Sequence, residues 1–82
     1  MSEYSSPLNA GPGVMTEEAG VVTGDLELRS TLGPDGVLTA KVRYAGADEW
    51  YRLRGGLTKL TDPADHGPVH ALLVGVLNRP AG

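Results

Sequence analysis

From residue 21 onward, apolar and polar residues alternate with a period of two, which is typical of half-buried β-strands. In residues 21–30 the apolar side chains fall on even positions, namely Val22, Leu26 and Leu28. The sequence TLGPDG then supplies turn residues. In residues 37–44 the apolar side chains again share one face, namely Leu38, Ala40, Val42 and Tyr44. These patterns predict two antiparallel strands joined by a short hairpin.

Residues 50–54, with the sequence WYRLR, predict a third strand after the turn AGADE. If Tyr51 and Leu53 face the core, then Trp50, Arg52 and Arg54 face the solvent. The opposite arrangement would bury two guanidinium groups without an evident partner, at a cost of several kcal/mol each. We therefore predict that the indole and both guanidinium groups point outward. Leu57 and Leu60 follow, either in a short fourth strand or in a covering loop.

The last element is predicted to be a helix. Pro68 suits the first helical position and Gly67 is an acceptable cap. Spacing typical of a helix places five apolar residues on one stripe, namely Val69, Leu72, Leu73, Val76 and Leu77. We expect Asn78 to stop the helix in the left-handed conformation and Pro80 to prevent its continuation. The outer side of this helix is less polar than usual, so a second copy of the chain is a candidate to cover it.

Residues 1–19 are rich in Ser, Gly, Pro and Glu, and their aliphatic residues are scattered. Such a segment buries too little apolar surface to offset the entropy lost on ordering. We interpret residues 1–19 as a flexible acidic tail and residues 20–82 as one small β-β-β-α domain. The predicted fold is α+β, with a three-stranded antiparallel sheet, or four strands if the short one forms, packed on one C-terminal helix in two layers.

The composition narrows the classes of function. The net charge is −3, and the chain has no cysteine, which excludes disulfides and thiolate metal sites. The N-terminal residues lack the pattern of a secretory signal, and the longest apolar stretch, ALLVGVL, is far shorter than the roughly 20 residues of a membrane-spanning helix. We therefore expect a cytoplasmic protein. Residues 21–82 carry no net charge, which weakens a nucleic-acid interpretation.

Basic residues gather on the predicted solvent face of the sheet. A tight second hairpin with Tyr44 opposite Tyr51 would set Arg43 across from Arg52 and Lys41 across from Arg54. Like charges in such positions destabilise a sheet, so we expect something to neutralise them.

Two registers of the first hairpin remain open. One register pairs Glu27 with Lys41 and Asp25 with Arg43, which brings acids to the basic strand. The neighbouring register pairs Leu32 with Leu38 and sets Arg29 beside Lys41, which makes this face more basic.

The basic face has two interpretations. It is either a solvated surface with mixed charges or a binding surface formed by Lys41, Arg43, Trp50, Arg52 and Arg54. Trp50 is either a lid on the edge of the sheet or an interface anchor, a role in which Trp and Arg are enriched. Our leading hypothesis is a non-catalytic protein-interaction module, self-associating as a homodimer, that binds an acidic protein surface or an anionic ligand. The alternative is a small nucleic-acid-binding domain that uses the same face.

The only polar cluster suited to a metal is Asp62, Asp65, His66 and His70. Two histidines four residues apart can bind a metal from one helix face. However, Gly67 and Pro68 intervene, so we expect His66 to precede the helix. No nucleophile or phosphate-loop motif is present. We therefore predict no enzyme activity, no metal and no cofactor.

The segments LTAKVRYAG and GGLTKLTDPAD, followed by a helix, resemble a group of small uncharacterised actinobacterial proteins. The resemblance covers about residues 38–65 and rests on Thr39, Ala40, Lys41, Leu60, Asp62, Pro63, Ala64 and Asp65. It implies a strand-strand-strand-helix layout related in shape to double-stranded-RNA-binding domains. The helix after DPAD is shorter and less charged here than in that group, so the resemblance bears on the fold alone.

Overall fold

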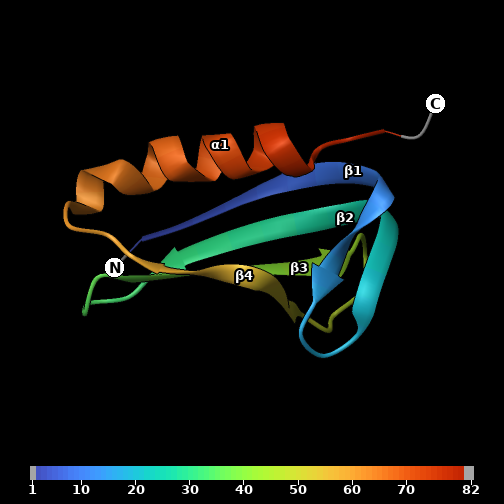
Figure 1. Ribbon diagram of the computed structural model, residues 1–82, viewed down its shortest axis with the longest axis horizontal. Helices are drawn as coiled ribbons and strands as arrows, with labels where there is room; N and C mark the ends of the chain where they lie inside the picture. The colour runs from blue at the N-terminus through green and yellow to red at the C-terminus, as the bar shows by residue number, and fades with distance from the viewer. Residues whose placement is uncertain (1, 81–82) are drawn as a thin grey trace.

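The computed structural model describes residues 2–80 and shows an antiparallel sheet with one helix near the C-terminus (Figure 1). The elements are β1 (Ser2–Thr16), β2 (Gly20–Leu32), β3 (Val37–Tyr44), β4 (Tyr51–Lys59), the short 3-10 helix η1 (Pro63–Asp65) and α1 (His66–Leu77). The strands lie in the sheet in chain order, and the end of β1 also meets β4 through the pair Thr16–Leu53. The predicted α+β class, with an antiparallel sheet and a C-terminal helix, is confirmed.

The prediction of a flexible tail over residues 1–19 is wrong, because residues 2–16 form β1, which pairs with β2 over most of its length (Figure 1). Leu8, Ala10 and Val14 occupy even positions of β1 and belong to the hydrophobic core. These side chains supply the apolar surface that the composition of the segment appeared to lack. The fourth strand therefore comes from the N-terminus, and Leu57 lies within a longer β4.

Two residues that usually weaken strands are accommodated in β1. Pro7 lies opposite Glu27 in the part of β1 that pairs with β2 alone, because β4 meets β1 only at Thr16, so the missing N–H of Pro7 on the unpaired side leaves no gap in the ladder. Gly13 has a φ of 95° and lies where the β1–β2 register shifts, between Ala10 and Val14. This bulge lets β1 bend and continue to the Thr16–Leu53 pair.

The registers of both later hairpins are defined. β2 and β3 pair Leu32 with Leu38 and Arg29 with Lys41, which is the more basic of the two predicted registers. The predicted pairing of Tyr44 with Tyr51 is wrong, because Tyr51 lies opposite Val42 and Arg52 lies opposite Lys41. Because the connection between β3 and β4 is longer than a tight hairpin, Tyr51 and Arg52 pair with residues nearer the start of β3 than predicted.

The predicted orientation of residues 50–54 is confirmed. Tyr51 and Leu53 are half-buried and pack against the core, whereas Arg52 and Arg54 are exposed. The core lies between the sheet and α1, and its buried members include Leu26, Leu28 and Val42.

Helix α1 runs along β1 and also contacts β2 (Figure 1). The predicted apolar stripe is wrong in part. Leu73 and Leu77 pack on the core together with Val74, whereas Leu72 and Val76 are exposed by 65% and 57%. The buried face of α1 is rotated because its first turns bury His66 and His70 instead.

The end of α1 also differs from the prediction. Asn78 has an extended backbone, with φ −76° and ψ 91°, and is not left-handed. Its side-chain oxygen accepts a hydrogen bond from the Asn9 N–H at 2.8 Å. Arg79 then pairs with the free edge of β1, where its N–H donates to the Asn9 carbonyl at 2.8 Å. The chain after α1 therefore leaves the helix extended in order to bind β1.

Within residues 2–80, no helix combines the length and the apolar character that crossing a membrane requires.

Candidate binding surface on the sheet

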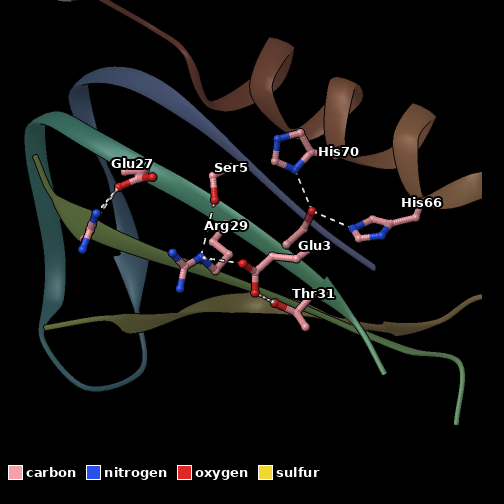
Figure 2. Close-up of polar contacts among 9 residues, drawn as sticks. Glu3, Ser5, Glu27, Arg29, Thr31, His66 and His70 are labelled. Carbon is pink, nitrogen blue, oxygen red and sulfur yellow. Dashed lines mark hydrogen bonds and ion pairs between the residues drawn. The ribbon is translucent and has the colours of Figure 1, made fainter. Parts of the chain in front are cut away.

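The sheet face that points away from α1 carries charged side chains from several strands, and we call it the outer face. β2 contributes Glu27, Arg29 and Thr31 to it, and Figure 2 shows these residues with Glu3 and Ser5 of β1. They occupy odd positions of both strands, so their side chains point away from the side chains of the buried even positions. The outer face is therefore the polar half of the alternation seen in the sequence.

Three basic residues lie side by side across the middle of the outer face. Arg29 on β2 is paired with Lys41 on β3, and Lys41 is paired with Arg52 on β4. We call Arg29, Lys41 and Arg52 the cationic row. Like charges at directly opposite positions destabilise a sheet, so this row lowers stability unless other groups neutralise it.

The two ends of the cationic row have carboxylate partners. Arg29 Nε lies 3.6 Å from a Glu3 carboxylate oxygen (Figure 2). At the other end, Glu18 accepts hydrogen bonds from the Arg52 backbone N–H at 2.8 Å and from Arg52 Nε at 3.1 Å. The backbone hydrogen bond, reinforced by the guanidinium, lowers the pKa of the Glu18 carboxyl.

Lys41 in the centre of the row is exposed, and no carboxylate among residues 2–80 forms an ion pair with it. It borders a shallow hollow beneath the β2–β3 turn. The other residues lining this hollow are Thr31, Gly33, Pro34, Asp35, Val37 and Thr39. The centre of the cationic row therefore has no neutralising ion-pair partner among the described residues and stands beside space that a ligand group can enter.

Trp50 lies on the outer face with two guanidinium groups against it. The guanidinium carbons of Arg29 and Arg43 are 4.1 Å and 4.6 Å from the ring centroid of Trp50. Cation–π attraction of this kind contributes about 0.5–1 kcal/mol at an exposed site. Trp50 is half-buried, so part of its surface stays accessible. The arrangement orients a large aromatic side chain on the solvent side of the sheet.

Arg43 is the most firmly held of the predicted binding residues. Its guanidinium is 2.6 Å from a Glu27 carboxylate oxygen, and both side chains are about one-quarter exposed. Arg54, in contrast, is exposed and has no register partner on β3, because the β3–β4 pairing shifts beyond the Lys41–Arg52 pair. The structure thus brings Lys41, Arg43, Trp50 and Arg52 together around the row, whereas Arg54 lies outside it.

Reasoning from the sequence did not identify three residues of this surface as binding or neutralising groups, namely Glu3, Glu18 and Arg29. Glu3 and Glu18 lie in the segment that the sequence predicts to be a flexible tail. Arg29 joins the cationic row in only one of the two β2–β3 registers that the sequence leaves open. The alternation of apolar and polar residues in β2 places Arg29 on the same face as Glu27, and this pattern could have identified Arg29.

A second polar group lies on the opposite side of the sheet, beneath α1. The expectation that His66 precedes the helix is wrong, because α1 begins at His66. His66 and His70 are only 1% and 6% exposed (Figure 2). One nitrogen of each ring contacts the Ser30 hydroxyl of β2. The other nitrogen contacts a serine of β1, which is Ser2 for His66 and Ser6 for His70. We call these two histidines and three serines the buried histidine cluster. Over residues 2–80, no three His, Cys, Asp or Glu side chains gather in a way that would hold a metal ion.

Asp62 belongs to the candidate metal-binding residues predicted from the sequence. In the structure its carboxylate accepts a hydrogen bond from the Ala64 N–H at 2.9 Å and caps η1.

Comparison with protein-family models, with curated proteins and with solved structures gives no significant match.

Proposed function

We propose that this protein is a non-catalytic interaction module whose outer face binds an acidic segment of a partner protein. The observation that carries the proposal is the cationic row, whose central Lys41 lacks a carboxylate partner among the described residues. The half-buried indole of Trp50 lies against Arg29, at one end of this row. A partner carboxylate over Lys41 would complete the neutralisation that Glu3 and Glu18 begin at the two ends. Trp50 would then supply the apolar anchor that protein interfaces favour.

The alternative ligand, a nucleic-acid backbone, has less support. Arg29, Arg43 and Arg52 each have a carboxylate within 4 Å, so a phosphate approaching them would meet negative charge as well. Protein–nucleic acid affinity depends largely on uncompensated Lys and Arg contacts with phosphates. A surface of alternating sign is better matched to a folded or extended acidic protein segment than to a phosphate chain.

Self-association is the second part of the proposal. The outer side of α1 has no charged side chain and is exposed over Pro68, Ala71, Leu72, Gly75 and Val76. A second copy is the occupant that we favour, because two uncharged helix surfaces can approach without electrostatic repulsion. The cytoplasmic location and the absence of catalysis stay predictions from the sequence.

The test uses Trp50 as a reporter, since it is the only tryptophan in the chain. A glutamate-rich peptide is titrated into the protein while Trp50 fluorescence is recorded. We expect Lys41→Glu to weaken binding by about tenfold, because it reverses the charge that meets the peptide. Lys59→Glu is the matched control, because it makes the same change at the only other lysine, which is exposed at the end of β4.

Stability gives an independent readout in the same variants. Lys41→Glu should increase the free energy of unfolding by up to about 1 kcal/mol, because it places a carboxylate between two arginines. A variant that folds more stably but binds less tightly would show that Lys41 serves binding. Equal weakening by both lysine variants would contradict the proposal, as would tighter binding of an oligonucleotide than of the peptide at low salt.

A further inference from the structure

The proposed binding surface does not use the buried histidine cluster, which lies on the opposite side of the sheet. The chain has two histidines, and both lie one turn apart on the buried side of α1. Ser30 is fully buried and joins them, since its hydroxyl oxygen is 2.8 Å from His66 Nε2 and 2.6 Å from His70 Nδ1. Ser2 contacts His66 Nδ1, and Ser6 lies 2.8 Å from His70 Nε2. All four ring nitrogens therefore face a serine hydroxyl.

Counting hydrogens shows which charge states this cluster can hold. A serine hydroxyl has one hydrogen to donate, and a neutral imidazole has one donor and one acceptor nitrogen. With both rings neutral, hydrogen bonds can run in one direction from Ser2 through His66, Ser30 and His70 to Ser6, or in the reverse direction. Every ring nitrogen is then satisfied, in agreement with the absence of unpaired buried side-chain atoms over residues 2–80.

One added proton preserves this network. A single imidazolium donates from both nitrogens, and Ser30 accepts one of these hydrogen bonds while it donates its own hydrogen to the neutral ring. A second proton does not fit. Both rings would then donate to Ser30, whose hydrogen would lose its acceptor, and two positive charges would lie one helical turn apart in a buried site.

The groups around the rings offer no negative charge to compensate. β1 contributes Tyr4, whose ring lies 4.6 Å from the His66 ring in an edge-on orientation, together with Ser2 and Ser6. β2 contributes Ser30, and Asp65 of η1 is exposed and bonds to neither ring. Burial lowers the pKa of the His70 imidazole, and positive charge on His66 lowers it further.

We propose that the buried histidine cluster is a pH-sensitive latch that keeps α1 on β1 and β2 while at most one of its two rings is protonated. Binding of the second proton releases α1 and exposes Leu73, Val74 and Leu77. In the unfolded chain both histidines bind protons below a pKa of about 6.5, whereas the folded chain excludes one of these protons. Stability is therefore complete above about pH 6.5 and declines as the pH falls, with the folding equilibrium constant dropping about tenfold per pH unit for the excluded proton.

The test follows the two imidazole rings and the α1 amides of the wild-type chain by NMR from pH 8 to pH 4.5. We expect one ring to titrate while the α1 amides stay protected from hydrogen exchange, and the second titration to coincide with loss of that protection. Release of α1 with the first proton would overturn the proposal. So would protection that persists to pH 4.5, whichever rings have titrated.

The variant His66→Gln isolates the second proton. Its amide can replace the contact of Nε2 with Ser30 but cannot be charged, so protonation of His70 leaves every hydroxyl satisfied. We expect the pH of α1 release to fall by at least about one unit relative to the wild type, which corresponds to about a tenfold change in proton activity. Ala64→Gln, exposed on η1 and outside the proposed self-association surface, should release the helix at the wild-type pH. Release of α1 at the wild-type pH in His66→Gln would overturn the latch, and if that variant does not fold, the wild-type titration still decides.

Discussion

At the scale of single residues, two glycines should respond to alanine in opposite ways. Gly13 has a φ of 95°, and an added Cβ would collide with the Val21 side chain. We expect Gly13→Ala to lower the free energy of unfolding by about 1–3 kcal/mol, because an L-residue is strained there. Gly75 lies in α1 with no atom within 4 Å of its added Cβ. Gly75→Ala should therefore raise stability by about 0.5–1 kcal/mol through helix propensity.

Urea unfolding monitored by Trp50 fluorescence measures both glycine variants against the wild type. An equal loss of stability in both would show that the β1 bulge is not the strained position that its backbone indicates.

Single residues were predictable from the sequence where burial of a charge was the alternative. The outward direction of Arg52 and Arg54 followed from the cost of burying guanidinium groups, and it is confirmed. The burial of His66 and His70 could not be predicted in this way, because it depends on hydroxyls from Ser2 and Ser6, some 64 residues away in sequence. A histidine becomes a favourable core residue only when such distant partners are known.

At the scale of elements, β1 is the main difference between prediction and structure. Its composition is that of a flexible segment, yet its few apolar side chains fall on positions that share one face with Ser2 and Ser6. A small number of aliphatic residues is sufficient because Ser2 and Ser6, at two further inward positions, bind histidines. The serines of β1 also explain why the buried face of α1 differs from the predicted apolar stripe. This face includes His66 and His70, which bind those serines.

Removal of β1 tests this interpretation of the N-terminal residues. A chain of residues 20–82 lacks Leu8, Ala10 and Val14 of the core and leaves both histidines without their β1 serines. We expect this chain to show no cooperative thermal unfolding by circular dichroism, whereas residues 2–82 should unfold cooperatively. A folded 20–82 chain would restore the prediction of a dispensable tail.

At the scale of the whole molecule, two faces stay exposed once the core is formed, and each has a proposed partner. The outer face carries paired charges around Trp50, and the outer side of α1 carries none. Because they lie on opposite sides of the sheet, a self-associated protein can still present its binding surface. The class of fold was predictable from periodicity alone. The cationic row was not, because the sequence left the β2–β3 register open and predicted the wrong β3–β4 register.

Self-association through α1 can be separated from association through the sheet with two matched substitutions. Leu72 on α1 and Leu57 on β4 are exposed by 65% and 66%, so Leu→Glu adds the same charge at equal exposure on different surfaces. A helix of 12 residues is about 18 Å long, so the interface is small and association is expected only at high protein concentration. Under those conditions we expect sedimentation to give twice the chain mass of 8.5 kDa for the wild type and for Leu57→Glu, but the monomer mass for Leu72→Glu. A dimer that is lost in Leu57→Glu and kept in Leu72→Glu would place the contact on the sheet, and a monomeric wild type would refute self-association.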